Sequence, residues 1–166
     1  MGNKVYIIGP IISNDNQKAY DLAGVNAVSP NKFMSMLPKN NSTIEVYINS
    51  VGGSVFAGSE IYTMLKEYKG KVIVKVVGLA ASIASVIAMG GDEIQISPTG
   101  QMMIHNVTTS AGGDYRTFEH TAEVLKTANQ SIANAYHFKT KKSLSELKIM
   151  MDREVWFNAQ SAIGHG

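Results

Sequence analysis

The chain has 166 residues, of which 15 are Lys or Arg and 13 are Asp or Glu, and it contains no Cys. This length fits one domain with a hydrophobic core of its own, and the net charge of +2 is too balanced to indicate a nucleic-acid or membrane-binding surface. Without Cys the chain can form no disulfide, no thiol nucleophile and no Cys-ligated metal site.

The first half of the chain alternates short β-rich runs with segments of helical spacing. We predict strands at residues 5–8, 44–48 and 71–77, and helices within 14–26 and at 32–37, 54–68 and 82–89. Turns rich in small residues are predicted at 49–53 and 78–81. The most apolar stretch, 76–89, is interrupted by Gly78 and two serines. It is also shorter than the roughly 20 residues of a membrane-spanning helix, so it indicates a buried core segment.

The second half contains two further predicted strands, at 93–96 and 102–105, followed by a polar loop at 106–114. The longest helix is predicted at 115–138, which lacks Gly and Pro. Ser143 and Glu146 form a capping box that opens a last helix through Met151. Strands that alternate with helices indicate an α/β fold with a largely parallel sheet. We expect a single domain over residues 1–166.

A double glycine, Gly52 and Gly53, stands directly after a buried strand and before a helix. Glycines at such a place let backbone N–H groups approach a ligand closely, as in an oxyanion hole. A simple strand-to-helix turn would use the same residues, so this motif alone leaves both interpretations open.

Two side chains suited to catalysis also lie near the ends of predicted strands. Ser82 opens an apolar helix, where the helix dipole stabilises negative charge, although a serine at this place is also an ordinary N-cap. His105 ends a strand before a polar loop and could be a general base or a structural histidine. The remaining histidines lie in the long helix and at the C-terminus, and fit a catalytic role less well.

Five stretches together resemble the proteolytic subunit of the Clp protease, and most closely the related serine proteases of phages and prophages. The matching stretches, in the family's order, are 47–53, 58–62, 78–82, 103–105 and 156–159. The resemblance covers essentially the whole chain. It implies the α/β fold shared with crotonases, with a largely parallel sheet, flanking helices and a protruding handle helix in the region of about 106–140.

The resemblance also implies roles for individual residues. Ser82 would be the nucleophile and His105 the general base. Alignment of 156–159 with the family's motif makes Glu154 the acid of the triad, with Asp152 as its competitor. The family's oxyanion hole corresponds to the backbone N–H groups of Gly53 and Ile83.

Substrate contacts follow from the same resemblance, in which an extended peptide adds a strand between two backbone segments. One segment corresponds to Gly52, Ser54 and Val55, and the other to Asn106 and Val107. No cofactor and no metal are implied. The expected partners are a peptide or protein substrate and further copies of the chain in a homo-oligomeric ring, with rings stacked through the handle.

The implied function is a serine endopeptidase of the bacterial cytoplasm, for phage head maturation or prophage protein degradation. The N-terminus begins almost at the first strand, so the axial loop that engages an unfoldase ATPase looks shortened, which leaves that partner in doubt. Relatives continue beyond Gly166 into a further short strand, and we expect a truncation there. Two rival functions stay open: a catalytically idle assembly subunit with a misaligned triad, and an acyl-CoA hydratase or isomerase of the crotonase type, which uses carboxylates and needs no serine.

Overall fold

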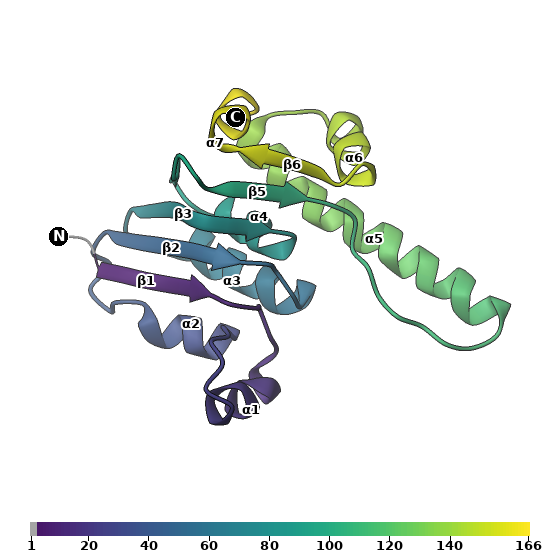
Figure 1. Cartoon of the computed structure of the whole chain (residues 1–166), viewed down its shortest axis with the longest axis horizontal. Helices are drawn as coiled ribbons and strands as arrows, with labels where there is room; N and C mark the ends of the chain where they lie inside the picture. The colour runs from purple at the N-terminus through teal and green to yellow at the C-terminus, as the bar shows by residue number, and fades with distance from the viewer. Residues whose placement is uncertain (1–2) are drawn as a thin grey trace.

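A computed structural model describes residues 3–166 and shows a mixed α/β fold (Figure 1). Residues 1 and 2 of the predicted domain lie outside the described residues. The strands are β1 (Asn3–Ile8), β2 (Ile44–Ser50), β3 (Val72–Ala81), β4 (Glu93–Ile96), β5 (Gln101–Ile104) and β6 (Val155–Asn158). The helices are η1 (Asn14–Asn16), α1 (Gln17–Leu22), α2 (Pro30–Met36), α3 (Val55–Glu67), α4 (Ile83–Ala88), α5 (Tyr115–Thr140), α6 (Leu144–Asp152) and α7 (Ala159–Gly164).

The sheet has the strand order β1-β2-β3-β5-β6, and β4 pairs with β3 beside this path. All pairings are parallel except that of β5 with β6, which confirms the predicted largely parallel sheet. β3 has two partners on one side: its first half pairs with β4 and its second half with β5. Because parallel strands end at the same edge, the loop after β2, the residue after β3 and the residue after β5 come together there.

The core lies between the sheet and the helices that cover it. β2 contributes Ile44, Val46 and Ile48, which alternate with outward-facing residues and are fully buried. Ile61 and Leu65 of α3 belong to the same cluster. Burial of each such side chain stabilises the fold by about 1.5–3 kcal/mol before entropy is counted. The buried residues of β2, which recur at every second position, and those of α3, which recur at helical spacing, therefore belong to the same hydrophobic core.

Several predicted boundaries and one predicted turn were wrong. Residues 78–81 continue β3 instead of forming a turn, because Ala80 pairs with Ser50 on one side and with Met102 on the other. α2 begins at Pro30 rather than Lys32, since Ser29 caps it and proline suits the first helical position. The long helix ends at Thr140, after the predicted 138.

β6 and α7 were not predicted from the sequence. β6 has only four residues, and its pattern on its own does not distinguish it from a loop. What makes it a strand is its antiparallel pairing with β5, in which Ile104 lies opposite Val155. α7 follows at once and is capped by Asn158, whose side chain accepts a hydrogen bond from the Ser161 N–H.

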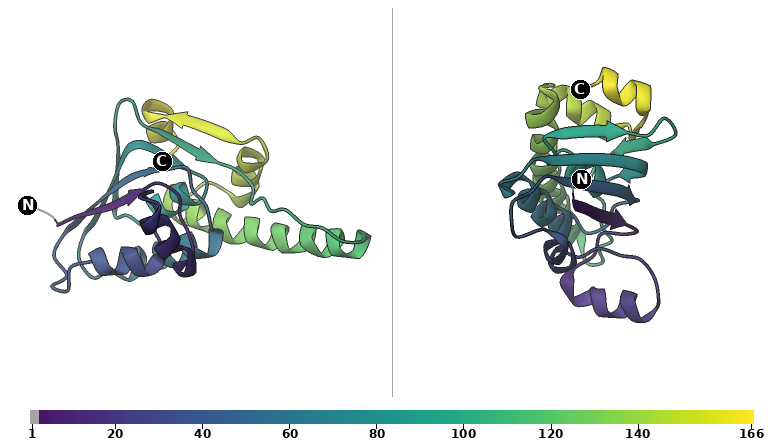
Figure 2. Two further views of the ribbon diagram at one scale, coloured as in Figure 1. Left: turned by 60° about the horizontal axis from the view of Figure 1, so that its bottom comes forward. Right: turned by 90° about the vertical axis from the view of Figure 1, so that its left-hand side faces the viewer.

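The long helix α5 extends well beyond the body of the molecule (Figures 1 and 2). Its outer half is exposed, and the apolar side chains of Tyr115 and Phe118 there are 69% and 52% exposed. Its inner half carries the buried Ile132 and Tyr136 and packs on the body. This arrangement agrees with the protruding helix expected from the family resemblance. No helix within residues 3–166 has the length and apolar character needed to cross a membrane.

Candidate active site

Ser82 joins β3 to α4 in an uncommon backbone conformation, with φ 55° and ψ −131°. A non-glycine residue at positive φ costs on the order of 1–3 kcal/mol, which surrounding contacts must offset. The Ser82 N–H donates to the Met103 carbonyl at 2.9 Å, and its own carbonyl accepts from the Ser85 N–H at 3.0 Å. The Ser82 side chain makes no capping bond to α4, so the interpretation of this serine as a side-chain N-cap was wrong.

The hydroxyl of Ser82 lies in hydrogen-bond contact with His105. The distance from Ser82 Oγ to His105 Nε2 is 2.8 Å, and the His105 side chain is 23% exposed. The contact follows from the parallel register of β3 and β5, which pairs Ala81 with Met103 and leaves both residues just past the strand ends. A histidine nitrogen at this distance can take the hydroxyl proton during attack on a carbonyl carbon.

Glu154 approaches the other ring nitrogen of His105 from the turn between α6 and β6. Its Oε2 lies 3.9 Å from His105 Nδ1, which is beyond hydrogen-bond distance, and its side chain is 57% exposed. The residue has φ 49°, in the left-handed region. Trp156 Nε1 donates to Glu154 Oε1 at 3.4 Å. The antiparallel register of β5 and β6 thus brings a carboxylate to the histidine without closing a hydrogen bond.

Asp152, the competing acid, has a different partner. Its Oδ1 accepts a hydrogen bond of 2.8 Å from Asn106 Nδ2. This bond ties the residue after His105 to the end of α6. The two carboxylates therefore have separate contacts: Glu154 faces the histidine ring and Asp152 holds the neighbouring loop.

The double glycine forms a closely packed backbone loop next to Ser82. Gly52 and Gly53 have φ 95° and 146°. A Cβ on Gly53 would lie 2.1 Å from the Ile11 carbonyl oxygen, so only glycine fits there. The Ile11 N–H donates to the Gly52 carbonyl and the Ile11 carbonyl accepts from the Ser54 N–H, each at 2.8 Å. Ile11 was not identified from the sequence, because no local signal connects it to a loop some forty residues later.

Two backbone donors at this site have no acceptor within the described part of the chain. Among the hydrogen bonds of residues 3–166, none is donated by the N–H of Gly53 or by the N–H of Ile83. Gly53 belongs to the loop after β2, and Ile83 is the first residue of α4. Unpaired N–H groups beside a serine hydroxyl are the arrangement that stabilises an oxyanion.

A pocket of about 200 Å³ opens over Ser82 and His105. Its other lining residues are Gly53, Val55, Ile83, Val107, Thr108 and Ile132. The wall is mostly apolar and contains no Asp or Glu. Thr108 and Ile132 were not predicted, since neither differs in sequence pattern from an ordinary loop or helix residue.

The predicted substrate-binding residues are only partly brought together. Val55 and Val107 line the pocket, but the Val107 N–H already donates to Asn129 Oδ1 at 2.7 Å. The Ser54 hydroxyl caps α3 by accepting from the Ala57 N–H. Gly52 is buried beneath Ser82, and Asn106 is turned toward Asp152.

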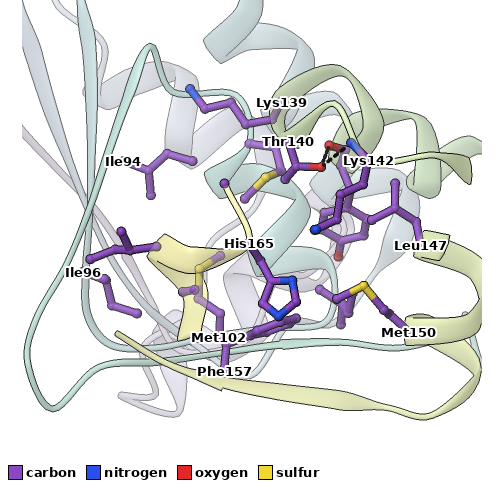
Figure 3. A pocket seen from close by; sticks show the side chains of 16 residues that line it. Ile94, Ile96, Met102, Lys139, Thr140, Lys142, Leu147, Met150, Phe157 and His165 are labelled. Carbon is purple, nitrogen blue, oxygen red and sulfur yellow. Dashed lines mark hydrogen bonds between the residues drawn. The ribbon is translucent and has the colours of Figure 1, made fainter. Parts of the chain in front are cut away.

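A second pocket, of about 210 Å³, lies between the β4–β6 region and helices α5 to α7 (Figure 3). Its wall is largely apolar, and Phe157 and His165 lie against one another there. Lys139 at its rim donates to the carbonyls of Gly91 and Asp92, and Lys142 pairs with Glu146. None of the residues predicted for catalysis lines this pocket. Within residues 3–166 no cluster of three or more His, Asp or Glu could hold a metal ion.

The family model and the individual relatives that match this chain all refer to the same family. The family model described as Clp protease matches residues 26–166. The ATP-dependent Clp protease proteolytic subunit 1 of Salinibacter ruber is 27% identical over 129 residues, which cover 76% of this chain and 55% of the relative. The proteolytic subunits of Chlorella vulgaris and Bacteroides fragilis (strain ATCC 25285) are 31% and 32% identical, over 77% and 74% of this chain and 65% and 60% of the relatives. The chain thus spans between 55% and 65% of the length of these relatives.

Proposed function

Because this chain belongs to the Clp protease family, we propose that it is a serine endopeptidase that hydrolyses peptide bonds by acyl transfer. The observation that carries the proposal is the 2.8 Å contact between Ser82 Oγ and His105 Nε2 beside the pocket. Two N–H groups without a partner in residues 3–166, those of Gly53 and Ile83, stand at the same place. A nucleophile, a base and oxyanion donors are the parts that acyl transfer requires.

The reaction has two halves. Ser82 Oγ attacks the peptide carbonyl carbon while His105 Nε2 takes the hydroxyl proton, and the negative oxygen receives hydrogen bonds from the N–H groups of Gly53 and Ile83. The C–N bond then breaks, and the proton passes from His105 to the leaving amine. A water molecule attacks the acyl-enzyme in the same way and releases Ser82.

Peptide or protein chains are the substrates that we propose. The apolar wall formed by Val55, Val107 and Ile132 would hold an apolar side chain next to the bond that is cleaved. The peptide backbone would run between the loop after β2 and the segment after β5. Because the Val107 N–H already donates to Asn129, Val107 would offer the peptide its carbonyl group rather than its N–H.

We further propose that the chain works in a homo-oligomeric ring, with rings stacked through α5. The exposed Tyr115 and Phe118 on the outer half of α5 support an interface there. A bacterial cytoplasmic role in phage head maturation or prophage protein degradation rests on the sequence resemblance alone. The relatives are named ATP-dependent Clp protease proteolytic subunits.

The idle assembly subunit is the second candidate, and a specific observation favours it. Glu154 lies 3.9 Å from His105 Nδ1, too far to orient the ring by a hydrogen bond. A crotonase-type hydratase or isomerase is disfavoured, because the pocket over Ser82 contains no carboxylate. The first of two experiments separates these functions, and the second identifies the acid of the triad.

The first experiment is labelling with a fluorophosphonate probe, which forms a covalent bond with an activated serine. We expect the folded wild-type protein to be labelled at Ser82, and neither the Ser82→Ala variant nor heat-unfolded wild type to react. Mass spectrometry of the digested protein identifies the labelled residue. Labelling that persists in Ser82→Ala would show another nucleophile, and a folded, oligomeric wild-type protein that does not react would support the idle subunit.

The second experiment compares Glu154→Gln with Asp152→Asn. We expect Glu154→Gln to lower kcat/KM for a peptide substrate by about 10- to 100-fold, since loss of a buried triad acid costs about 10⁴-fold and this one is 57% exposed. Asp152→Asn retains an oxygen that can accept from Asn106, so its activity should stay within about threefold of wild type. The opposite ranking of the two variants would give the role of the third residue to Asp152.

A further inference from the structure

A chain of buried hydroxyl groups connects α5 to the backbone of Ser82. Tyr136 of α5 and Ser85 of α4 are 3% and 0% exposed, and their hydroxyl oxygens are 2.7 Å apart. Ser85 Oγ also lies 2.6 Å from the Ser82 carbonyl oxygen. Neither hydroxyl takes part in the mechanism derived above.

The direction of the hydrogen bonds in this chain is fixed by proton counting. The Ser82 carbonyl can only accept, so the single hydroxyl proton of Ser85 is donated to it. Ser85 Oγ then has no proton for Tyr136, and the Tyr136 hydroxyl must donate to Ser85. Burial raises the pKa of Tyr136, so its phenol keeps the proton that this arrangement needs.

The carbonyl at the end of the chain belongs to the same peptide unit as a proposed oxyanion donor. The Ser82 C=O and the Ile83 N–H share one planar trans peptide, in which the two groups point in opposite directions. Hydrogen bonds from the Ser85 N–H and Ser85 Oγ hold the carbonyl toward the protein interior. The Ile83 N–H is thereby turned toward the pocket, where residues 3–166 offer it no acceptor.

We propose that Ser85 and Tyr136 are positioning residues, which orient the Ile83 N–H for the oxyanion by anchoring the Ser82 carbonyl. The inference rests on the proposed peptidase function. The backbone of Ser82 makes such an anchor necessary, because at its φ of 55° the ordinary left-handed conformation has ψ near about +47°, whereas ψ is −131° here. Rotation of the Ser82–Ile83 peptide about ψ would relieve this strain if the carbonyl were not held. Tyr136 acts through Ser85, because its hydroxyl contacts Ser85 Oγ and it is Ser85 Oγ that contacts the Ser82 carbonyl.

The test measures peptide hydrolysis by Ser85→Ala, Tyr136→Phe and the double variant. Removal of a whole oxyanion donor costs about 10²- to 10³-fold in kcat, and a misoriented donor should cost less. We expect kcat to fall about 10-fold in Ser85→Ala and about threefold in Tyr136→Phe, with KM unchanged. The double variant should match Ser85→Ala alone, because Tyr136 has no effect once Ser85 is absent.

Tyr68→Phe is the matched control. It also removes a tyrosine hydroxyl that donates to an internal acceptor, the Ser42 carbonyl at 2.6 Å, but at a distance from Ser82 along the sheet. We expect its kcat to equal that of wild type at a similar loss of stability. Equal kcat values for Tyr136→Phe and Tyr68→Phe, or losses confined to KM, would overturn the proposal.

Crystal structures of the variants test the proposal independently of activity. The Ser82–Ile83 peptide should be rotated, or present in two orientations, in Ser85→Ala and Tyr136→Phe and unchanged in Tyr68→Phe. An unchanged peptide plane in both site variants would refute the positioning role. If wild type hydrolyses no peptide while the plane rotates as expected, the proposed function fails, whereas the anchoring of the Ser82–Ile83 peptide by Ser85 and Tyr136 is supported.

Discussion

Replacement of His105 by glutamine is expected to lower kcat/KM for peptide hydrolysis by on the order of 10⁴-fold or more. In the wild-type structure, Ser82 Oγ lies 2.8 Å from His105 Nε2. A glutamine side chain at position 105 can still form a hydrogen bond with this hydroxyl. It cannot accept the hydroxyl proton as a base, so the attacking oxygen stays poorly nucleophilic. The rate is measured with a fluorogenic peptide, and the rate of fluorophosphonate labelling provides a second readout of the same activation.

His165→Gln is the control for this variant. His165 follows α7 and lines the second pocket rather than the pocket over Ser82. Its substitution should leave both rates within about twofold of wild type. If His105→Gln keeps more than a tenth of the wild-type rate, another group must take the serine proton, and the mechanism proposed here is wrong.

The parts of the site that the sequence predicted share one physical feature. Ser82 and His105 each follow directly on a strand, the double glycine follows β2 after Val51, and strong local signals identify all three strands. Parallel strands end at a common edge, so residues of this kind converge whatever the exact strand boundaries are. For this reason the prediction of residues 78–81 as a turn did not affect the position predicted for Ser82.

The parts that were missed depend on contacts between distant segments. The Ser85–Tyr136 hydrogen bond joins residues 51 positions apart, and each residue alone fits an ordinary buried helix position. β6 becomes a strand only through β5, and the distance from Glu154 to the histidine follows from that register. Local propensity contains no information on such pairings, because it is a property of one segment at a time.

Gly53→Ala is expected to produce the largest loss of stability among single substitutions at the site. The residue has φ 146°, and an added Cβ would lie 2.1 Å from the Ile11 carbonyl oxygen. Both the backbone strain and the overlap with backbone atoms must be relieved by movement of the loop. We expect the free energy of unfolding to fall by about 2–4 kcal/mol, measured by urea denaturation at equilibrium.

Gly112→Ala is the control, since a Cβ at Gly112 meets nothing within 4 Å. Its free energy of unfolding should change by less than about 0.5 kcal/mol. The clash at Gly53 involves main-chain atoms, so shortening the Ile11 side chain in an Ile11→Ala, Gly53→Ala double variant should restore neither stability nor activity.

Gly58 offers the opposite case, in which an added Cβ meets a side chain. A Cβ there would lie 2.2 Å from Ile83 Cγ1, which is a side-chain atom. Truncation of Ile83 to alanine should therefore relieve Gly58→Ala, although it leaves a cavity between α3 and α4. If Gly53→Ala proved as stable as Gly112→Ala, the Ile11 backbone would not fix the loop, and the orientation of the Gly53 N–H would lose its structural cause.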